Sequence, residues 1–147
     1  MDTKLTKKDW VLLILKEAPM DRIHIMKALF LIWHRNQRKI PDYFEFVPYL
    51  YGPCSFEVYS VLKTLQYEGF IVEFPRSLFR WVKYYLTEKG KKEATMVAQK
   101  VSSDIFEIVK EVINEISKLN FYELLRKVYS EAPDFANNSL FKEVINI

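Results

Sequence analysis

The sequence predicts a mainly helical fold with a small β-hairpin: a winged helix-turn-helix followed by appended C-terminal helices. Three observations support this prediction. Apolar residues recur at helical spacing in three separate segments of about the first 68 residues. Two short runs rich in β-branched and aromatic residues, 70–74 and 81–86, flank a brief loop. From Asp104 onward the pattern is again helical. The order of three helices, a hairpin and further helices is that of a winged helix.

The first two helices have clear start and stop signals. Thr6 can cap a run that carries apolar residues from Trp10 to Leu15, and Pro19 closes that run. Asp21 can cap the second helix. This second helix is apolar on most of its sides, which predicts a central, buried position.

An aromatic, extended segment leads into the third helix. Pro48 excludes a helix interior within this segment, which extends over 44–51. Gly52 and Pro53 indicate a turn, in which a glycine permits a positive φ or close backbone packing. Ser55 is the N-cap candidate of a helix that runs to about Glu68. The apolar stripe of this helix predicts its inward face and contains Val58, Val61, Leu62 and Leu65.

The hairpin follows directly, and we expect the segment 47–49 to join it as a third strand. Thr87 can cap a helix that continues to about Lys100. These residues complete a predicted winged-helix domain over 1–100.

Residues 101–147 form a predicted helical extension. Its first helix carries an apolar stripe within 105–119 that can either pack on the domain or pair with a second copy to form a homodimer. The stripe contains Ile105, Val109, Val112, Ile116 and Leu119. Asn120 can cap one further helix, which Pro133 ends.

Composition and charge bound the function. Half of the 147 residues are hydrophobic, which is ample for a core, and no apolar run is long enough to span a bilayer. Cys54 is the only cysteine, so we expect a cytoplasmic protein without an internal disulfide. Residues 1–100 contain 17 basic and 11 acidic side chains, whereas residues 101–147 contain 5 and 8. A basic first part favours a nucleic-acid partner there.

Double-stranded DNA is the expected partner, contacted by the third helix and the wing. Hydroxyl and amide side chains can bond to base edges, and lysine or arginine can meet phosphates. Lys7 and Lys8 can add contacts to the backbone. The expected DNA-binding residues are Ser55, Tyr59, Ser60, Lys63, Thr64, Tyr67, Arg76, Arg80 and Lys83. The resulting prediction is a non-catalytic transcriptional regulator.

A different reading makes the same surface a docking site for a partner protein. Aromatic residues dominate binding hot spots. Four tyrosines lie on or near the third helix: Tyr49, Tyr51, Tyr59 and Tyr67. The exposed face of the third helix is also consistent with a merely solvated surface.

Three blocks of sequence resemble a known family. The block FVPYLYGPCSFEVYSVLKTLQYEGFI (46–71), the block YYLTEKGKK (84–92) and the block FYELLRKVYSEAPDFANNS (121–139) are similar to small prokaryotic proteins with Panacea-type domains. Many of these are associated with phages or antitoxins. The segment 27–30, KALF, departs from the Leu-Leu pair that is commoner in relatives. The resemblance implies a winged-helix module that acts as a DNA-binding regulator or as a toxin-neutralising partner, and it implies no catalytic residues.

The sequence offers little catalytic chemistry. Cys54 precedes a helix start, where a thiol can become reactive, but a buried filler beside a turn is the stronger interpretation. His24 and His34 lie roughly 15 Å apart on one predicted helix, too far to share a metal ion. Three glycines in the whole chain do not supply a phosphate-binding loop. We therefore expect no enzyme, no metal and no cofactor.

Overall fold

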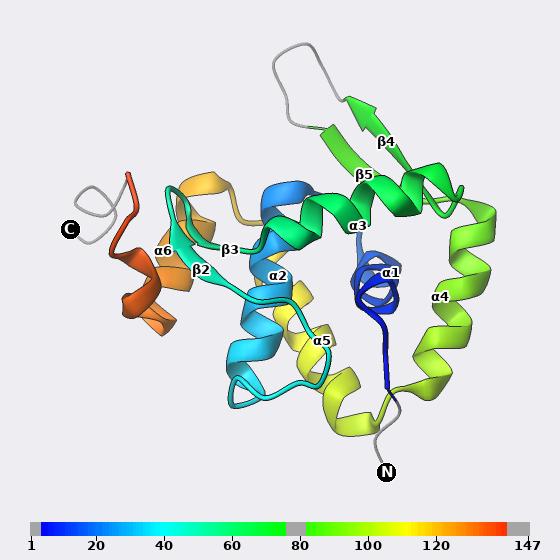
Figure 1. Ribbon diagram of the computed structural model, residues 1–147, viewed down its shortest axis with the longest axis horizontal. Coiled ribbons are helices and arrows are strands. Elements are labelled where there is room, and N and C mark those ends of the chain that lie inside the picture. Colours follow the sequence, from blue (N-terminus) through cyan, green and yellow to red (C-terminus); the bar gives the residue numbers. More distant parts are fainter. Residues whose placement is uncertain (1–3, 76–81, 141–147) are drawn as a thin grey trace.

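The computed structural model describes residues 4–75 and 82–140, and it is mainly helical with small antiparallel sheets (Figure 1). The helices are α1 (Lys7–Glu17), α2 (Arg22–Arg35), α3 (Phe56–Tyr67), α4 (Glu88–Lys100), α5 (Ser103–Ile116), α6 (Phe121–Glu131) and the short 3₁₀ helix η1 (Pro133–Ala136). The strands are β1 (Met20–Asp21), β2 (Val47–Tyr49), β3 (Gly52–Cys54), β4 (Ile71–Pro75) and β5 (Val82–Leu86).

Four helices begin at the residues that the sequence predicts. The side chains of Thr6, Asp21, Thr87 and Asn120 each accept a hydrogen bond from a backbone N–H in the first turn of the helix that follows. Thr6 and Asn120 form full capping boxes, in which the third helical residue bonds back to the cap. Local side-chain chemistry thus fixes these helix starts.

The predicted hairpin is confirmed, but its third strand is not the expected one. β4 and β5 pair antiparallel, and β1 pairs with the other edge of β5, giving the strand order β1-β5-β4. The expectation that residues 47–49 join this sheet is wrong. They form β2, which pairs with β3 in a separate two-stranded sheet. A loop of only two residues separates β2 from β3, so their pairing closes a much shorter loop than pairing with the wing would.

Gly52 closes the β2–β3 hairpin in a conformation that favours glycine. Its φ is +89°, in the left-handed region. A Cβ added at Gly52 would lie 2.7 Å from Cε1 of Tyr129 on α6. The structural interpretation of this glycine is therefore confirmed on both counts, positive φ and close packing.

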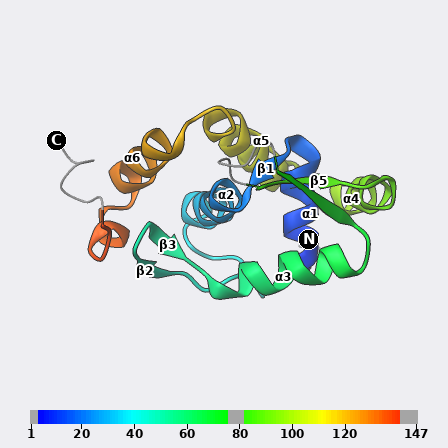
Figure 2. The ribbon, with the colours of Figure 1, turned by 90° about the horizontal axis from the view of Figure 1, so that it is seen from above.

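Helix α2 runs through the centre of the molecule. It contacts α1, α5 and α6, and many of its side chains are fully buried, including Ile25, Ala28, Leu29, Phe30 and Leu31. Figure 2 shows α3 on one side of α1 and α2, and α5 on the opposite side. α4 packs on α1. The buried residues of all these helices form one continuous hydrophobic core.

The apolar stripe of α5 is used within this chain. Val109, Val112 and Ile116 are fully buried, and Ile105 and Leu119 are half-buried against the same core. Of the two alternatives for this stripe, the structure shows packing within the chain. The expectation that residues 105–119 form the interface of a homodimer is therefore wrong. A second copy cannot reach this stripe unless α5 leaves α1 and α2.

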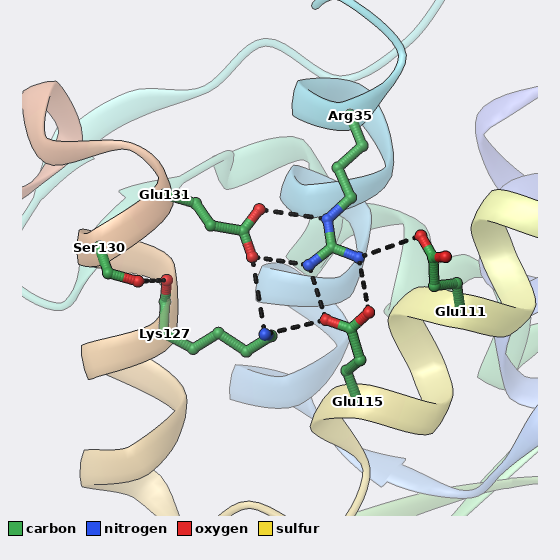
Figure 3. Close-up of polar contacts among 6 residues, drawn as sticks. All are labelled: Arg35, Glu111, Glu115, Lys127, Ser130 and Glu131. Atoms are coloured by element: carbon green, nitrogen blue, oxygen red, sulfur yellow. Dashed lines mark hydrogen bonds and ion pairs between the residues drawn. The ribbon is translucent and has the colours of Figure 1, made fainter.

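A network of charged side chains holds α5 and α6 against the end of α2 (Figure 3). The Arg35 guanidinium donates to both carboxylate oxygens of Glu115, at 2.7 and 3.1 Å, and to both of Glu131, at 2.6 and 3.1 Å. Glu111 lies 3.5 Å away, and Lys127 reaches Glu115 at 2.8 Å. The bonds from Arg35 and Lys127 lower the pKa of Glu115 to about 2, and the bonds to Glu115 and Glu131 raise the pKa of Arg35.

Two further contacts fix the C-terminal segment, one to the loop that follows α2 and one to the first turn of α2. Arg38 forms a bidentate pair with Asp134 of η1. At the other end of α2, the His24 ring lies 2.9 Å from Asp21 and 2.7 Å from the backbone oxygen of Leu119. Burial alone would lower the pKa of His24, but the hydrogen bond and charge of Asp21 outweigh burial and raise it.

Candidate nucleic-acid interface

The polar face of α3 is open to solvent. Val58, Leu62 and Leu65 point inward and are buried, as the sequence predicts. Four of the expected DNA-binding residues lie on the exposed side: Ser60, Lys63, Thr64 and Tyr67. Tyr67 is 93% exposed. Helices α5 and α6 do not cover this face, because they pack on the far side of α2 (Figure 2).

Ser55 does not belong to this exposed surface. The residue occupies the N-cap position of α3, but its side chain makes no capping bond and is only 2% exposed. Its backbone N–H donates to Sδ of Met26 at 3.3 Å, which holds it against α2. The expectation that Ser55 contacts bases is therefore wrong, because tight packing of the turn on α2 buries the hydroxyl.

Tyr59 lies at the edge of the surface rather than on its open part. Its ring is half-buried, and the guanidinium carbon of Arg22 lies 5.5 Å from the ring centroid. Burial raises the pKa of Tyr59, with further contributions from Cys54. The phenol is therefore a neutral hydrogen-bonding group near neutral pH.

The predicted wing, which contains strands β4 and β5, carries the remaining expected residues. Lys83 is half-exposed on the central strand β5, between Asp21 of β1 and Phe74 of β4. Arg76 and Arg80 lie outside the described residues. Val82 and Tyr84, its neighbours on β5, face the cleft that Tyr59 of α3 also lines, whereas the charge of Lys83 acts on His24 of α2 and opposes the rise in its pKa.

Two of the lysines near α3 are already paired. Lys7 donates to Glu57 at 2.6 Å near the start of α3, and Lys8 donates to Glu68 at 3.0 Å near its end. Exposed pairs of this kind contribute little stability, about 0–1 kcal/mol, so a phosphate can compete with the carboxylates. Among the described residues, Lys63 forms no ion pair, which leaves its charge available.

A cleft of about 600 Å³ lies between the start of α2, α3 and the wing. Polar groups that line it come from Arg22, Tyr51, Tyr59, Glu73 and Tyr84. Burial, and then the neighbouring Glu73 carboxylate, raise the pKa of Tyr84. Arg22 is not predictable as part of this surface from local sequence signals, because only the fold brings it over Tyr59.

The β2–β3 hairpin presents a second exposed group of side chains beside this surface. Tyr49 and Phe56 meet edge to face, with ring centroids 5.3 Å apart and side chains 44% and 56% exposed. Val47 and Leu50 are also exposed. The hairpin therefore adds an apolar surface next to the first turn of α3.

The surroundings of the buried polar groups near the β2–β3 hairpin indicate structural rather than catalytic roles. Cys54 is 6% exposed, and burial raises the pKa of its thiol, so it is not an activated thiolate. The ammonium of Lys27 is buried and donates to the backbone oxygen of Pro53 at 3.1 Å. Burial lowers the pKa of Lys27 to about 8. Within residues 4–75 and 82–140, no three His, Cys, Asp or Glu side chains gather as a metal site would require.

No protein-family model matches this chain, and comparison with curated protein sequences gives no significant match. None of the helices in the described part of the chain is long and apolar enough to cross a membrane.

Proposed function

We propose that this chain is a non-catalytic winged-helix protein that binds double-stranded DNA and regulates transcription in the cytoplasm. The observation that carries the proposal is the polar face of α3, which stays exposed beside a three-stranded sheet. The element order α1-β1-α2-β2-β3-α3-β4-β5, in which the β2–β3 hairpin is inserted between α2 and α3, and the strand order β1-β5-β4 support the winged-helix assignment.

In this proposal α3 enters the major groove. Ser60, Thr64 and Tyr67 face the bases, and Lys63 meets a phosphate. Lys83, together with Arg76 and Arg80 of the wing, holds the backbone or the minor groove. Tyr59 and Arg22 border the contact at the start of α3. Lys7 and Lys8 add phosphate contacts once a phosphate displaces Glu57 and Glu68.

The test measures binding of the whole chain to labelled duplex DNA by fluorescence anisotropy over a range of salt concentrations. Binding through phosphates releases counterions, so affinity should fall steeply as salt rises. Lys63→Ala should weaken binding to all duplexes and reduce the slope of log affinity against log salt by about 1. The double variant Arg76→Ala/Arg80→Ala should flatten the slope further.

Lys118→Ala is the matched control, because Lys118 is also an exposed lysine but follows α5, the helix that lies on the opposite side of α1 and α2 from α3 (Figure 2). The slope of log affinity against log salt for Lys118→Ala should equal that of the wild-type protein. If Lys63→Ala and Lys118→Ala behave alike, α3 does not face the DNA.

A second function is supported by the exposed hairpin. The edge-to-face pair of Tyr49 and Phe56, with Val47 and Leu50 beside it, suits an antitoxin-type module that docks a partner protein. Phe56→Ser would then abolish capture of that partner while leaving DNA affinity unchanged. Loss of DNA binding in Phe56→Ser, without loss of folding, would instead count against a separate protein-binding surface.

A further inference from the structure

His24 places a titratable ring between the first turn of α2 and the connection from α5 to α6. The residue is only 9% exposed. Its Nδ1 lies 2.9 Å from Oδ1 of Asp21, and its Nε2 lies 2.7 Å from the backbone oxygen of Leu119. The ring therefore joins the cap of α2 to the residue that precedes the cap of α6.

Both partners of the His24 ring act as hydrogen-bond acceptors. The carbonyl oxygen of Leu119 has no proton to give. Burial raises the pKa of Asp21, but the hydrogen bonds and the charge of His24 outweigh burial and lower it, so this carboxylate is ionised near neutral pH. A neutral imidazole has one N–H and satisfies one of the two oxygens, whereas the imidazolium ion satisfies both. The two contacts therefore require a doubly protonated ring.

The charges that act on this ring come from two neighbouring strands. Asp21 of β1 favours the protonated ring, and Lys83, its partner on β5, opposes it. From the α5–α6 connection the ring meets the uncharged carbonyl of Leu119. Burial lowers the pKa of His24, but the contacts with Asp21 and Leu119 outweigh burial and raise the pKa above the ordinary value of 6.5.

The connection between α5 and α6 leads directly to the hairpin beside α3. Phe121, the first residue of α6, packs edge to face on Tyr51 in the loop between β2 and β3, with ring centroids 5.6 Å apart. Tyr129 of the same helix lies against Gly52. A change in how the start of α6 is held therefore reaches the β2–β3 hairpin.

We propose that His24 is a pH-sensitive latch, which holds the α5–α6 connection on α2 while its ring is doubly protonated. When one proton leaves, the other stays on Nδ1, because the Asp21 carboxylate is a stronger acceptor than the Leu119 carbonyl. The hydrogen bond from Nε2 to Leu119 is then lost. The latch is closed below pH 6.5 and opens as the pH rises through the pKa of His24 in the folded protein. It is independent of the proposed DNA contact.

The first test follows the ¹⁵N-labelled whole chain by NMR between about pH 5 and pH 9. Long-range ¹H–¹⁵N spectra report the protons on each ring nitrogen, and His34→Gln leaves His24 as the only histidine. We expect N–H groups on both nitrogens of His24 at low pH and on Nδ1 alone at high pH. The amide signal of Asn120, which shares a peptide group with the Leu119 oxygen, should shift with the same midpoint as the ring.

Hydrogen exchange measures how strongly the latch holds α6. After correction for the intrinsic effect of pH, the protection of α6 amides should fall about threefold to tenfold as His24 loses its proton, as expected for one hydrogen bond. His24→Gln should abolish this fall, because the glutamine does not titrate. His34→Gln is the matched control: Nδ1 of His34 accepts a hydrogen bond from Arg38 at 3.1 Å, so the fall should persist in this variant.

Lys83→Gln tests the latch without altering the ring or its two acceptors. The variant removes a charge that opposes protonation of His24, so the midpoints of the ring and of the Asn120 amide should move together to higher pH. Three results would each overturn the proposal: a single N–H on His24 below pH 6.5, an Asn120 midpoint that differs from that of the ring, or a fall in protection that persists in His24→Gln.

Discussion

Gly52 shows how one residue links two distant parts of the chain. Its positive φ closes the β2–β3 hairpin, and its missing side chain leaves room for Tyr129 of α6. Tyr129 is buried, and its hydroxyl donates to Ser139, so its ring cannot simply move aside. The hairpin beside α3 is thereby fitted against the C-terminal helix.

Gly52→Ala should therefore destabilise the protein by about 3 kcal/mol, since it adds a left-handed backbone penalty of about 1–2 kcal/mol to an overpacking cost of about 1–3 kcal/mol. Gly69→Ala is the matched control. Gly69 also has a positive φ, +82°, but a Cβ there would meet no atom within 4 Å. Urea denaturation measures both free energies of unfolding, and equal losses would contradict the role of Tyr129.

Lys27 is a second residue whose behaviour follows from its surroundings. Its pKa of about 8 lies below the ordinary value of 10.5, because burial disfavours the charged form. Between pH 8 and 10.5 the unfolded chain therefore binds more protons than the folded one at this side chain. The contribution of Lys27 to the free energy of unfolding should rise over this range.

Lys27→Met removes this titration and keeps the side-chain length. The stability of the wild-type protein relative to Lys27→Met should rise by about 3 kcal/mol between pH 8 and 10.5, in proportion to the shift. Urea denaturation at several pH values measures the difference between the two proteins. If the free energies of unfolding of the two proteins change with pH in parallel across this range, Lys27 is solvated and its pKa is not lowered by burial.

At the scale of elements, Arg35 joins three helices. Its guanidinium bonds to Glu115 of α5 and Glu131 of α6 from the end of α2 (Figure 3). The pKa of Glu115, lowered to about 2, gives stability that is present above pH 4.5 and is lost as the pH falls towards 2. The attachment of the C-terminal helices should therefore weaken in acid.

Arg35→Met should lower the free energy of unfolding at pH 7 by about 1–3 kcal/mol, because Glu115 and Glu131 lose the hydrogen bonds of the guanidinium and keep only Lys127 as a charged partner. The decline in stability from pH 4.5 to 2 should also become shallower than in the wild-type protein. Arg126→Met, at an exposed position of α6, should change stability by at most about 0.5 kcal/mol. Identical acid profiles for the Arg35 variant and the wild-type protein would exclude this role.

The elements that the sequence predicts correctly are those that local chemistry decides. The caps at Thr6 and Asp21 act within three residues of the helix start, and the wing strands pair with their nearest neighbours along the chain. The choice of β1 as third strand was not predictable, because a two-residue strand leaves no pattern of its own. The burial of Ser55 and Lys27 depends on how the turn before α3 packs on α2, which local spacing does not encode.

The same limit applies to the candidate interface. Helical periodicity correctly predicts which side of α3 faces the core and which side carries Lys63 and Tyr67. It cannot predict that Glu57 and Glu68 engage lysines of α1, nor that Arg22 stacks over Tyr59. These contacts join residues that are far apart in the sequence.

At the scale of the whole molecule, residues before and after position 100 share one core. α5 covers α1 and α2, and α6 covers α2. A chain that ends at residue 100 would expose buried side chains of α2 to water, such as Phe30, whose ring packs on Phe135 of η1 with centroids 4.7 Å apart. Such a fragment should lose its cooperative thermal transition and bind the dye ANS. A fragment that melts cooperatively, like the full chain, would show that the first 100 residues fold alone.

The burial of the α5 stripe has a consequence for the kind of operator that the proposed function would require. Regulators that join two copies back to back read inverted repeats, with half-sites one turn of the duplex apart. Here the stripe of α5 that the sequence suggested as a dimer surface is already occupied by α1 and α2 of the same chain. If one copy binds alone, its target carries no palindrome, and nuclease protection should cover a single, asymmetric stretch of DNA.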